Sequence, residues 1–225
     1  MKIVAIVGIG MGNPKNITIE GITYIKNADI VISNERLLNS FGDSFKDGVR
    51  VVSLNNTNEI ICFVENEIIA ENVSIAILVS GDTGYFSEAE RMIQSFLENP
   101  EVEVKSVPGI SSLSYFSSRL NLSYHNALSV NLHGEEEKII QYVVTHKKVF
   151  CISGGDVEIL LGELIKARAD HTLSENIRIY IGERLSYEDE KIIYSTLKDI
   201  HLHKNEIKQM SSLAVFLFEN DEAVF

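Results

Sequence analysis

The sequence predicts an α/β protein with two domains, and three observations support this class. Short β-branched runs such as Ile3–Val7 and Val73–Val79 alternate with segments whose apolar residues recur every three or four positions. Glycine-rich turns follow both of these runs directly. In the last third, strand-like segments succeed one another with little helix between them. We therefore expect a mostly parallel sheet in the N-terminal domain and a mixed sheet in the C-terminal domain.

The first half is expected to contain four strand–helix pairs. Thr18 is the expected cap of the first helix, and Ser87 with Glu90 has the S-x-x-E spacing of a capping box at the start of the third. Ser111 is the expected cap of the fourth helix. The strands are expected at residues 3–7, 29–33, 73–79 and 102–107, and the helices after 18, over 60–69, over 87–97 and after 111.

The pattern starts again after a polar stretch at residues 121–126, where we place a domain boundary. The predicted domains are residues 1–122 and 123–225, each within the usual size range of a domain. The strands of the second half are expected at residues 127–132, 148–153, 177–181, 191–196 and 213–218, and its helices at 136–145 and 157–168.

Composition excludes several classes of function. A formal net charge of −12 and the lack of a Lys/Arg cluster argue against a nucleic-acid partner. No apolar run approaches the roughly 18 residues needed to span a bilayer. The start Met1–Val4 does not resemble a secretory signal. We expect a cytoplasmic protein.

Cysteine and histidine usage predicts no metal site. Cys62 and Cys151 each lie in an apolar run, which favours buried, reduced thiols over a disulfide. His201 and His203 form an H-x-H pair, but no third ligand lies nearby in the sequence.

The stretch Gly81–Ser87 is the expected floor of a binding site. It follows a buried strand and precedes a patterned helix, and ligands of open α/β sheets bind outside the carboxyl ends of the strands. Asp82 suits a ligand that donates from hydroxyl or ammonium groups. The alternative is that Asp82 only closes an Asx-turn.

Two common ligand classes are disfavoured. Gly8-x-Gly10-x-Gly12 begins like a dinucleotide fingerprint, but Asn13 stands where the third glycine belongs. There is no P-loop motif, and Asp82 is an acid where a phosphate cradle needs donors. No conventional nucleophile motif occurs either.

Three ordered motifs resemble the tetrapyrrole methylase family of S-adenosylmethionine-dependent methyltransferases. They are Val7–Gly12 followed by Ile17-Thr18, Ser80–Tyr85, and Val107–Ser112. Later segments, namely Ser129–Gly134, Gly182–Tyr187 and Leu213–Phe216, look like the branch called CbiE, the cobalt-precorrin-7 (C-5)-methyltransferases of cobalamin biosynthesis.

The resemblance implies two α/β domains with the cofactor in the cleft between them, usually in a homodimer. It also implies a set of cofactor contacts by motif position. These residues are Met11, Gly81, Asp82, Thr83, Tyr85, Ser111, Ser112, Leu213 and Ala214.

The sequence departs from the family at two of these positions. Met11 stands where many members have proline, and Thr83 replaces the proline of the Gly-Asp-Pro loop. Both changes remove a fixed φ but leave the backbone groups available.

The implied chemistry needs little catalytic machinery. S-adenosylmethionine carries its methyl group on a cationic sulfur, so transfer to carbon needs mainly alignment and exclusion of water. Candidates for modest acid–base assistance are Asp82, Tyr85 and Glu183.

A precorrin carries many carboxylates, and an acidic protein must bind them through local clamps. The candidate substrate-binding residues are Arg36, Arg91 and Arg184, and Arg119 is also available.

Alternatives stay open in two directions. Another substrate of the same family, such as a different precorrin carbon, diphthine or ribosomal RNA, would keep the fold, although the acidic balance counts against RNA. A non-catalytic ligand-binding module would keep the cleft without turnover. The resemblance also implies functional coupling to a separate decarboxylating methyltransferase that acts on carbon 15.

Overall fold

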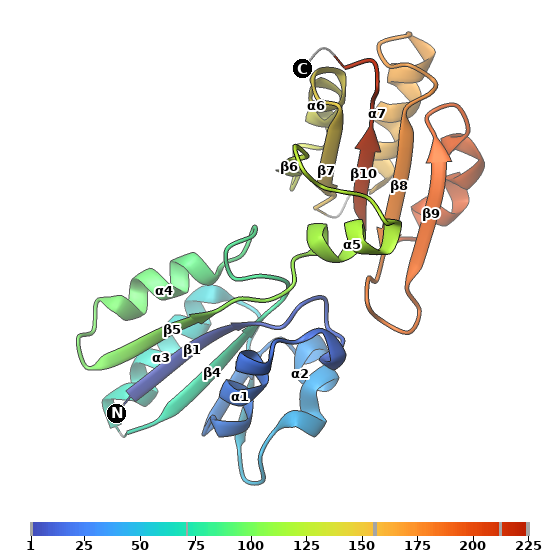
Figure 1. Ribbon diagram of the computed structural model, residues 1–225. Helices are drawn as coiled ribbons and strands as arrows, with labels where there is room; N and C mark the ends of the chain where they lie inside the picture. Colours follow the sequence, from blue (N-terminus) through green and yellow to red (C-terminus); the bar gives the residue numbers. More distant parts are fainter. Residues whose placement is uncertain (1, 71, 155–156, 212, 224–225) are drawn as a thin grey trace. The chain divides into compact units, whose positions relative to one another are not determined.

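The computed structural model describes residues 2–70, 72–154, 157–211 and 213–223. The chain divides into two compact units, Met1–Ser112 and Leu113–Phe225 (Figure 1). The division falls earlier than the boundary expected after residue 122, because the helix that begins at Ser112 packs on the C-terminal sheet. A Cβ added to Gly182 of that sheet would lie 2.7 Å from Cε2 of Phe116 in this helix.

The N-terminal unit is built on a parallel sheet of order β3-β2-β4-β1-β5. The prediction of a mostly parallel sheet is confirmed. The three central strands are buried along most of their length, as parallel strands covered on both faces must be. The strands are β1 (Lys2–Gly8), β2 (Ile30–Ser33), β3 (Arg50–Ser53), β4 (Ser74–Val79) and β5 (Val102–Val107).

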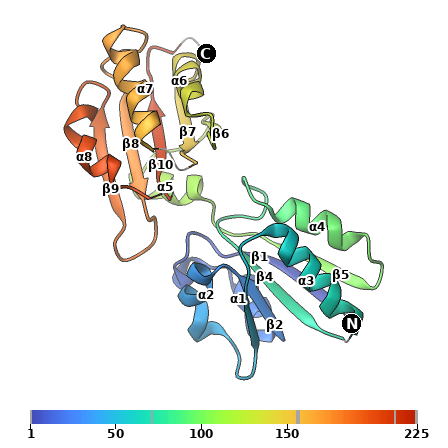
Figure 2. The same cartoon turned by 180° about the vertical axis from the view of Figure 1, so that it is seen from behind.

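Helices cover both faces of this sheet. One apolar core joins α3 and α4 to alternate residues of the strands, such as Ile6 and Ile77, and a second core joins α1 and α2 to the intervening residues, such as Val7 and Leu78 (Figures 1 and 2). Successive strand residues point to opposite faces, so the central strands β1, β2 and β4 contribute to both cores. The helices are α1 (Ile19–Asn27), α2 (Glu35–Phe41), α3 (Thr57–Ala70) and α4 (Ala89–Leu97), with 3₁₀ turns η1 (Pro14–Asn16) and η2 (Gly42–Ser44).

The predicted start of α1 is confirmed, but the predicted start of α4 is wrong. Thr18 accepts a hydrogen bond from the N–H of Gly21 at 3.0 Å and caps α1. Helix α4 begins at Ala89, and its N-cap position, Glu88, makes no side-chain cap. Ser87 accepts from the N–H of Ala89 at 3.2 Å, so its hydroxyl closes a turn before the helix instead of forming a capping box.

The sequence pattern missed α2 and β3. Helix α2 has only seven residues, capped by Asn34, which accepts from the N–H of Leu37 at 3.0 Å. Strand β3 lies at the sheet edge, and most of its four residues are exposed. Both elements are too short to show a clear hydrophobic period.

The C-terminal unit has a mixed sheet, as predicted, and its strand order is β6-β7-β10-β8-β9. Strands β6 and β7 pair in parallel, and the pairs of β10 with β7, β10 with β8, and β8 with β9 are antiparallel. The strands are β6 (Leu128–Asn131), β7 (Lys148–Ile152), β8 (Arg178–Glu183), β9 (Lys191–Thr196) and β10 (Val215–Glu219).

One face of this sheet packs on α6, α7 and α8 in a single large core, and α5 lies on the opposite face (Figures 1 and 2). No helix of the described ranges is long and apolar enough to cross a membrane. The helices are α5 (Ser112–Leu120), α6 (Ile139–Thr145), α7 (Val157–Ala169) and α8 (Lys204–Lys208), with 3₁₀ turns η3 (Glu136–Lys138) and η4 (Ile200–His203).

The two cysteines differ in burial. Cys151 on β7 is buried, and desolvation raises the pKa of its thiol, as expected for an inert core cysteine. Cys62 on α3 is exposed, so the prediction of a buried thiol is wrong there. Its apolar neighbours Ile60 and Val64 turn toward the core, and the helical period places Cys62 on the outer face.

Candidate functional site

The carboxyl ends of three neighbouring strands define the site of the N-terminal unit. Gly8 at the end of β1 pairs in register with Val79 of β4, and Val7 pairs with Val107 of β5. The chain after β1 leads to α1 on one face of the sheet, whereas the chain after β4 leads to α4 on the other face. The strand order therefore switches between β1 and β4, where open α/β sheets bind ligands.

The loops after β1 and β4 are joined by their backbones. The N–H of Gly10 donates to the carbonyl of Gly81 at 3.1 Å, and the N–H of Gly81 donates to the carbonyl of Gly10 at 2.7 Å. Both glycines have positive φ, +70° and +72°, which L-residues rarely adopt. Glycine is thus required for this junction.

A third loop, after β5, packs against the same junction. A Cβ added to Gly109 would lie 2.2 Å from the carbonyl oxygen of Gly81 and 2.6 Å from the carbonyl carbon of Gly8. These neighbours are backbone atoms and cannot rotate away. Gly8, Gly81 and Gly109 therefore bring three stretches of bare backbone together.

Asp82 connects the central loop to the third loop. Its Oδ1 accepts from the N–H of Gly84 at 2.9 Å, and its Oδ2 accepts from the N–H of Gly109 at 3.0 Å. The first bond is the Asx-turn considered from the sequence, and the second is a link that no local pattern predicts. Asp82 is half-buried, and its two carboxylate oxygens keep lone pairs that these two bonds do not use.

The other predicted residues of the first two loops each have a contact of their own. Met11 lies against Gly81, since its Cε is 3.4 Å from the position of an added Cβ. Thr83 accepts a hydrogen bond from the hydroxyl of Ser106 on β5 at 3.0 Å. Tyr85 packs edge-to-face on Phe86 with ring centroids 4.8 Å apart. The Ser106 contact gives Thr83 a polar anchor that proline could not provide.

The third motif and two of the arginines lie on neighbouring elements of this unit. Ser111 and Ser112 follow Gly109, and Ser112 is the first residue of α5. Arg91 on α4 is exposed and donates to the side-chain oxygen of Asn58, a neutral partner. Arg36 is half-buried in the first turn of α2.

In the C-terminal unit, Glu183 holds the backbone that leads into β10. Glu183 is only 5% exposed, and its Oε1 accepts from the N–H of Ser211 at 2.7 Å. The carbonyl of Ser211 accepts from the N–H of Ala214 at 3.2 Å, and the hydroxyl of Ser211 accepts from the N–H of Leu213 at 3.3 Å. Glu183 therefore positions the predicted contacts Leu213 and Ala214.

The end of β7 contacts Ala214 as well. The hydroxyl of Ser153 donates to the carbonyl of Ala214 at 3.0 Å, and Ser153 is fully buried. The structure thus brings Glu183, Ala214 and the end of β7 together in one unit.

Arg184 begins the connection between β8 and β9. Its Nε donates to Oδ2 of Asp189 at 2.6 Å, and its guanidinium lies 4.9 Å from the ring centre of Tyr187. The hydrogen bond from Arg184 lowers the pKa of Asp189. Arg184 and Ser186 both have positive φ, +50° and +72°, which marks this connection as strained.

Glu190 links the connection between β8 and β9 to α5 through hydrogen bonds. It accepts from the hydroxyl of Tyr115 at 2.8 Å, from Nε of Arg119 at 2.8 Å and from the N–H of Ser186 at 2.7 Å. Burial alone would raise the pKa of Glu190, but these three donors outweigh it and hold the pKa below its ordinary value. Arg119 is therefore committed to an internal pair.

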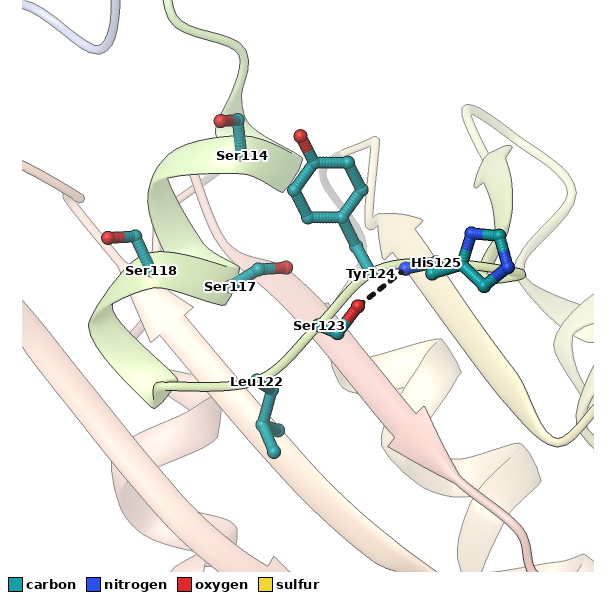
Figure 3. A pocket seen from close by; sticks show the side chains of 7 residues that line it. All are labelled: Ser114, Ser117, Ser118, Leu122, Ser123, Tyr124 and His125. Atoms are coloured by element: carbon teal, nitrogen blue, oxygen red, sulfur yellow. Dashed lines mark hydrogen bonds between the residues drawn. The ribbon is translucent and has the colours of Figure 1, made fainter.

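A pocket of about 390 Å³ lies beside α5 in the C-terminal unit (Figure 3). Most of its lining residues carry a hydroxyl group, and they come from α5 and the loop after it. The hydroxyl of Ser117 is buried, and within the described residues it has no hydrogen-bond partner. The lining residues are Ser114, Ser117, Ser118, Leu122, Ser123, Tyr124 and His125.

Sequence reasoning missed three residues with a structural part in these sites. Gly109 stands in the third motif without a role of its own, yet its N–H donates to Oδ2 of Asp82. Its sequence signal is the Pro-Gly turn after a strand. Ser211 and Glu190 had no sequence signal, because their partners lie far away in the chain.

Comparisons with known proteins identify the family. The family model for tetrapyrrole (corrin/porphyrin) methylases matches residues 3–201. A curated relative from Methanocaldococcus jannaschii, named probable cobalt-precorrin-7 C(5)-methyltransferase, is 29% identical over 97% of this chain and 99% of its own length.

Solved structures share the fold. The precorrin-6Y methylase of Archaeoglobus fulgidus matches with a TM-score of 0.68 at 19% identity, over 97% of this chain and 98% of that one. The uroporphyrin-III C-methyltransferase of Thermus thermophilus, complexed with S-adenosylhomocysteine, matches with a TM-score of 0.72 at 18% identity, over 96% and 97%. The family model spans most of the sequence, so the methyltransferase class predicted from the motifs is confirmed, and the chain belongs to the tetrapyrrole methylases.

Proposed function

We propose that this protein transfers a methyl group from S-adenosylmethionine to carbon 5 of cobalt-precorrin-7 in cobalamin biosynthesis. The observation that carries the proposal is the end-to-end match to the M. jannaschii relative of that name, which covers 97% of this chain and 99% of the relative. A match of this extent leaves no large domain of the relative unaccounted for.

The loop junction of the N-terminal unit fits the methyl donor. Gly8 and Gly109 let the loops after β1, β4 and β5 pack backbone to backbone, which gathers main-chain donors and acceptors at the carboxyl end of the sheet for a nucleoside with an amino-acid tail. The carboxylate of Asp82 is already fixed by two N–H groups and keeps lone pairs for a hydroxyl or ammonium donor. S-adenosylmethionine, when bound, supplies a methyl group on a cationic sulfur.

The remaining tasks of the protein are alignment and exclusion of water. Asp82 holds the central and third loops at a fixed separation, which preorganises the backbone that meets the ligand. Glu183 does the same for Leu213 and Ala214 in the C-terminal unit. We infer a positioning role for Glu183, because the residue is buried and its carboxylate accepts a hydrogen bond from the N–H of Ser211.

Substrate carboxylates need cationic clamps, and two arginines suit this role. Arg184 is anchored through Nε, so its Nη atoms are the ones that would bind a carboxylate. Arg91 donates to the neutral side chain of Asn58, which leaves its charge uncompensated by that partner. Arg36 is the third candidate, at the start of α2.

We further propose that the protein is a cytoplasmic homodimer and that a separate methyltransferase acting on carbon 15 uses its product. The family resemblance supports the homodimer and the coupling to the second methyltransferase. Light scattering after size-exclusion chromatography measures the mass, for which twice 25.2 kDa is expected.

Isotope transfer tests the reaction. The protein is incubated with cobalt-precorrin-7 and [methyl-¹³C]S-adenosylmethionine, and the product is examined by ¹³C NMR. We expect one labelled methyl group on carbon 5. A label on another ring carbon would refute the regiochemistry and favour the precorrin-4-type activity of a second relative, which is 25% identical over 94% of this chain.

Binding measurements separate the remaining alternative. Calorimetry with S-adenosylhomocysteine is expected to give one site per chain. Binding of this product without transfer to any precorrin would support a non-catalytic module, whereas no binding would refute the proposed methyl donor.

A further inference from the structure

Phe86 adopts a backbone conformation that suits its side chain poorly. It lies between β4 and α4, directly after Tyr85, and its φ is +49°. Positive φ is an outlier for a bulky residue, so the backbone is strained at this position. Among the described non-glycine residues with positive φ, Phe86 is the one with a purely hydrocarbon side chain; the others are Asn121, Asn126, His171, Arg184 and Ser186.

The ring of Phe86 is also not buried. It is 50% exposed, whereas Phe41, Phe96 and Phe116 are at most 1% exposed. Core burial therefore does not offset the strained backbone. Glycine or asparagine would relax this position at no loss of core packing.

Phe86 is presented from a loop that is fixed on both sides. Before it, Asp82 ties the loop to Gly84 and Gly109, and after it the hydroxyl of Ser87 accepts from the N–H of Ala89. Tyr85 packs edge-to-face on the ring at an interplanar angle of 67°. The exposed face is thus held in a defined orientation, as a preorganised contact requires.

We propose that the ring of Phe86 stacks on the flat conjugated face of the tetrapyrrole substrate. This inference rests on the proposed function and assigns a substrate-contacting residue to it. Aromatic rings prefer offset stacking on flat π-systems, and a half-exposed ring suits a large ligand that covers it from one side. A small ring such as adenine is usually enclosed within a pocket, which makes the cofactor the less suitable partner.

Two substitutions of Phe86 separate the effect of the aromatic ring from the effect of the backbone strain. Phe86→Leu keeps an apolar side chain in the strained conformation but removes the aromatic face. Phe86→Asn removes the face and relaxes the backbone, because asparagine tolerates positive φ. Leu97→Asn is the matched control, since Leu97 is an exposed apolar residue on α4, 57% exposed, with ordinary helical backbone.

The experiment titrates a stable carboxylated corrin, cobyrinic acid, and separately S-adenosylhomocysteine into each purified variant. Both Phe86 variants are expected to bind the corrin about 10-fold more weakly than the wild type and the Leu97 control, with unchanged affinity for S-adenosylhomocysteine. Phe86→Asn is also expected to raise Tm by about 3 °C, which Phe86→Leu does not.

Three outcomes would overturn the proposal. If both Phe86 variants bind the corrin as tightly as the wild type, the ring does not stack on the substrate. If the variants lose as much affinity for S-adenosylhomocysteine as for the corrin, the ring contacts the cofactor instead. A wild type that binds S-adenosylhomocysteine but no corrin refutes the proposed substrate itself, and with it the contact. The wild-type titration therefore distinguishes failure of the function from failure of the Phe86 assignment.

Discussion

Oδ2 of Asp82 accepts a hydrogen bond from the backbone N–H of Gly109 at 3.0 Å and so joins the loops after β4 and β5. The other carboxylate oxygen closes the turn at Gly84. Asp82 is therefore a structural residue of the candidate site as well as a candidate ligand contact, and the two roles make different predictions.

Replacing Asp82 by alanine leaves the N–H groups of Gly84 and Gly109 without their present acceptor. We expect a loss of about 1–3 kcal/mol in the free energy of unfolding, together with weaker binding of S-adenosylhomocysteine. Asp82→Asn retains one acceptor oxygen and should fall between the wild type and alanine. Urea denaturation and calorimetry measure both effects. Weaker binding with unchanged stability would show that Asp82 acts on the ligand alone.

Gly109 should not tolerate a side chain. In Gly109→Ala the new Cβ would meet backbone atoms of Gly81 and Gly8 at 2.2 and 2.6 Å, so the loops must separate. We expect destabilisation by more than about 3 kcal/mol, or a folded protein that does not bind S-adenosylhomocysteine. The control is Gly162→Ala in α7, where no atom lies within 4 Å of the added Cβ. Helix propensity predicts that the control gains about 0.5–1 kcal/mol. Wild-type stability and binding in Gly109→Ala would contradict the packing.

The carboxylate of Glu190 should make stability depend on pH. Its pKa is lowered in the folded protein, since the donors Ser186, Tyr115 and Arg119 outweigh the effect of burial. Its stabilising contribution is therefore fully present above the unfolded pKa of about 4.3 and is lost as pH falls through the lower folded value. The stability difference between wild type and Glu190→Gln should shrink as pH falls from 6 toward 3, as followed by urea denaturation. The exposed neighbour Glu188, replaced by glutamine, is the matched control.

The same contact affects Tyr115. Burial, followed by the hydrogen bond to Glu190, raises the pKa of Tyr115 to about 12. In Glu190→Gln the carboxylate charge is removed, and the pKa of this phenol should fall. The measurement is the ultraviolet absorbance of tyrosinate as a function of pH. Subtracting the curve of the double variant Glu190→Gln/Tyr115→Phe from that of Glu190→Gln leaves the titration of Tyr115 alone. A pKa that stays near 12 would mean that burial alone sets it.

Removing the hydroxyl of Ser117 should stabilise the protein. It is buried, and the described part of the chain offers it no partner, so Ser117→Ala removes an uncompensated polar group. We expect a gain of about 1 kcal/mol in the free energy of unfolding. Ser118→Ala, an exposed neighbour on the same helix, should change stability by less than about 0.5 kcal/mol. A loss of stability in Ser117→Ala would indicate that the hydroxyl is hydrogen-bonded in solution.

The sequence by itself determined the fold class, the positions of the long elements and the family. Strands such as β1 and β4 are continuous β-branched runs, and buried parallel strands require such runs. Thr18 determined the start of α1 because capping is a local interaction. The short elements α2 and β3 were not predicted, because segments of seven and four residues are too short to show a hydrophobic period.

Only the tertiary structure decided which groups meet in the candidate site. The bond from Gly109 to Asp82 and the bond from Ser211 to Glu183 join residues far apart in the chain, and no spacing rule encodes such pairs. The strain at Phe86 likewise depends on how the loop is fixed by its neighbours. Local propensity predicts segments, but long-range backbone contacts determine the conformation of the loops that carry the proposed chemistry.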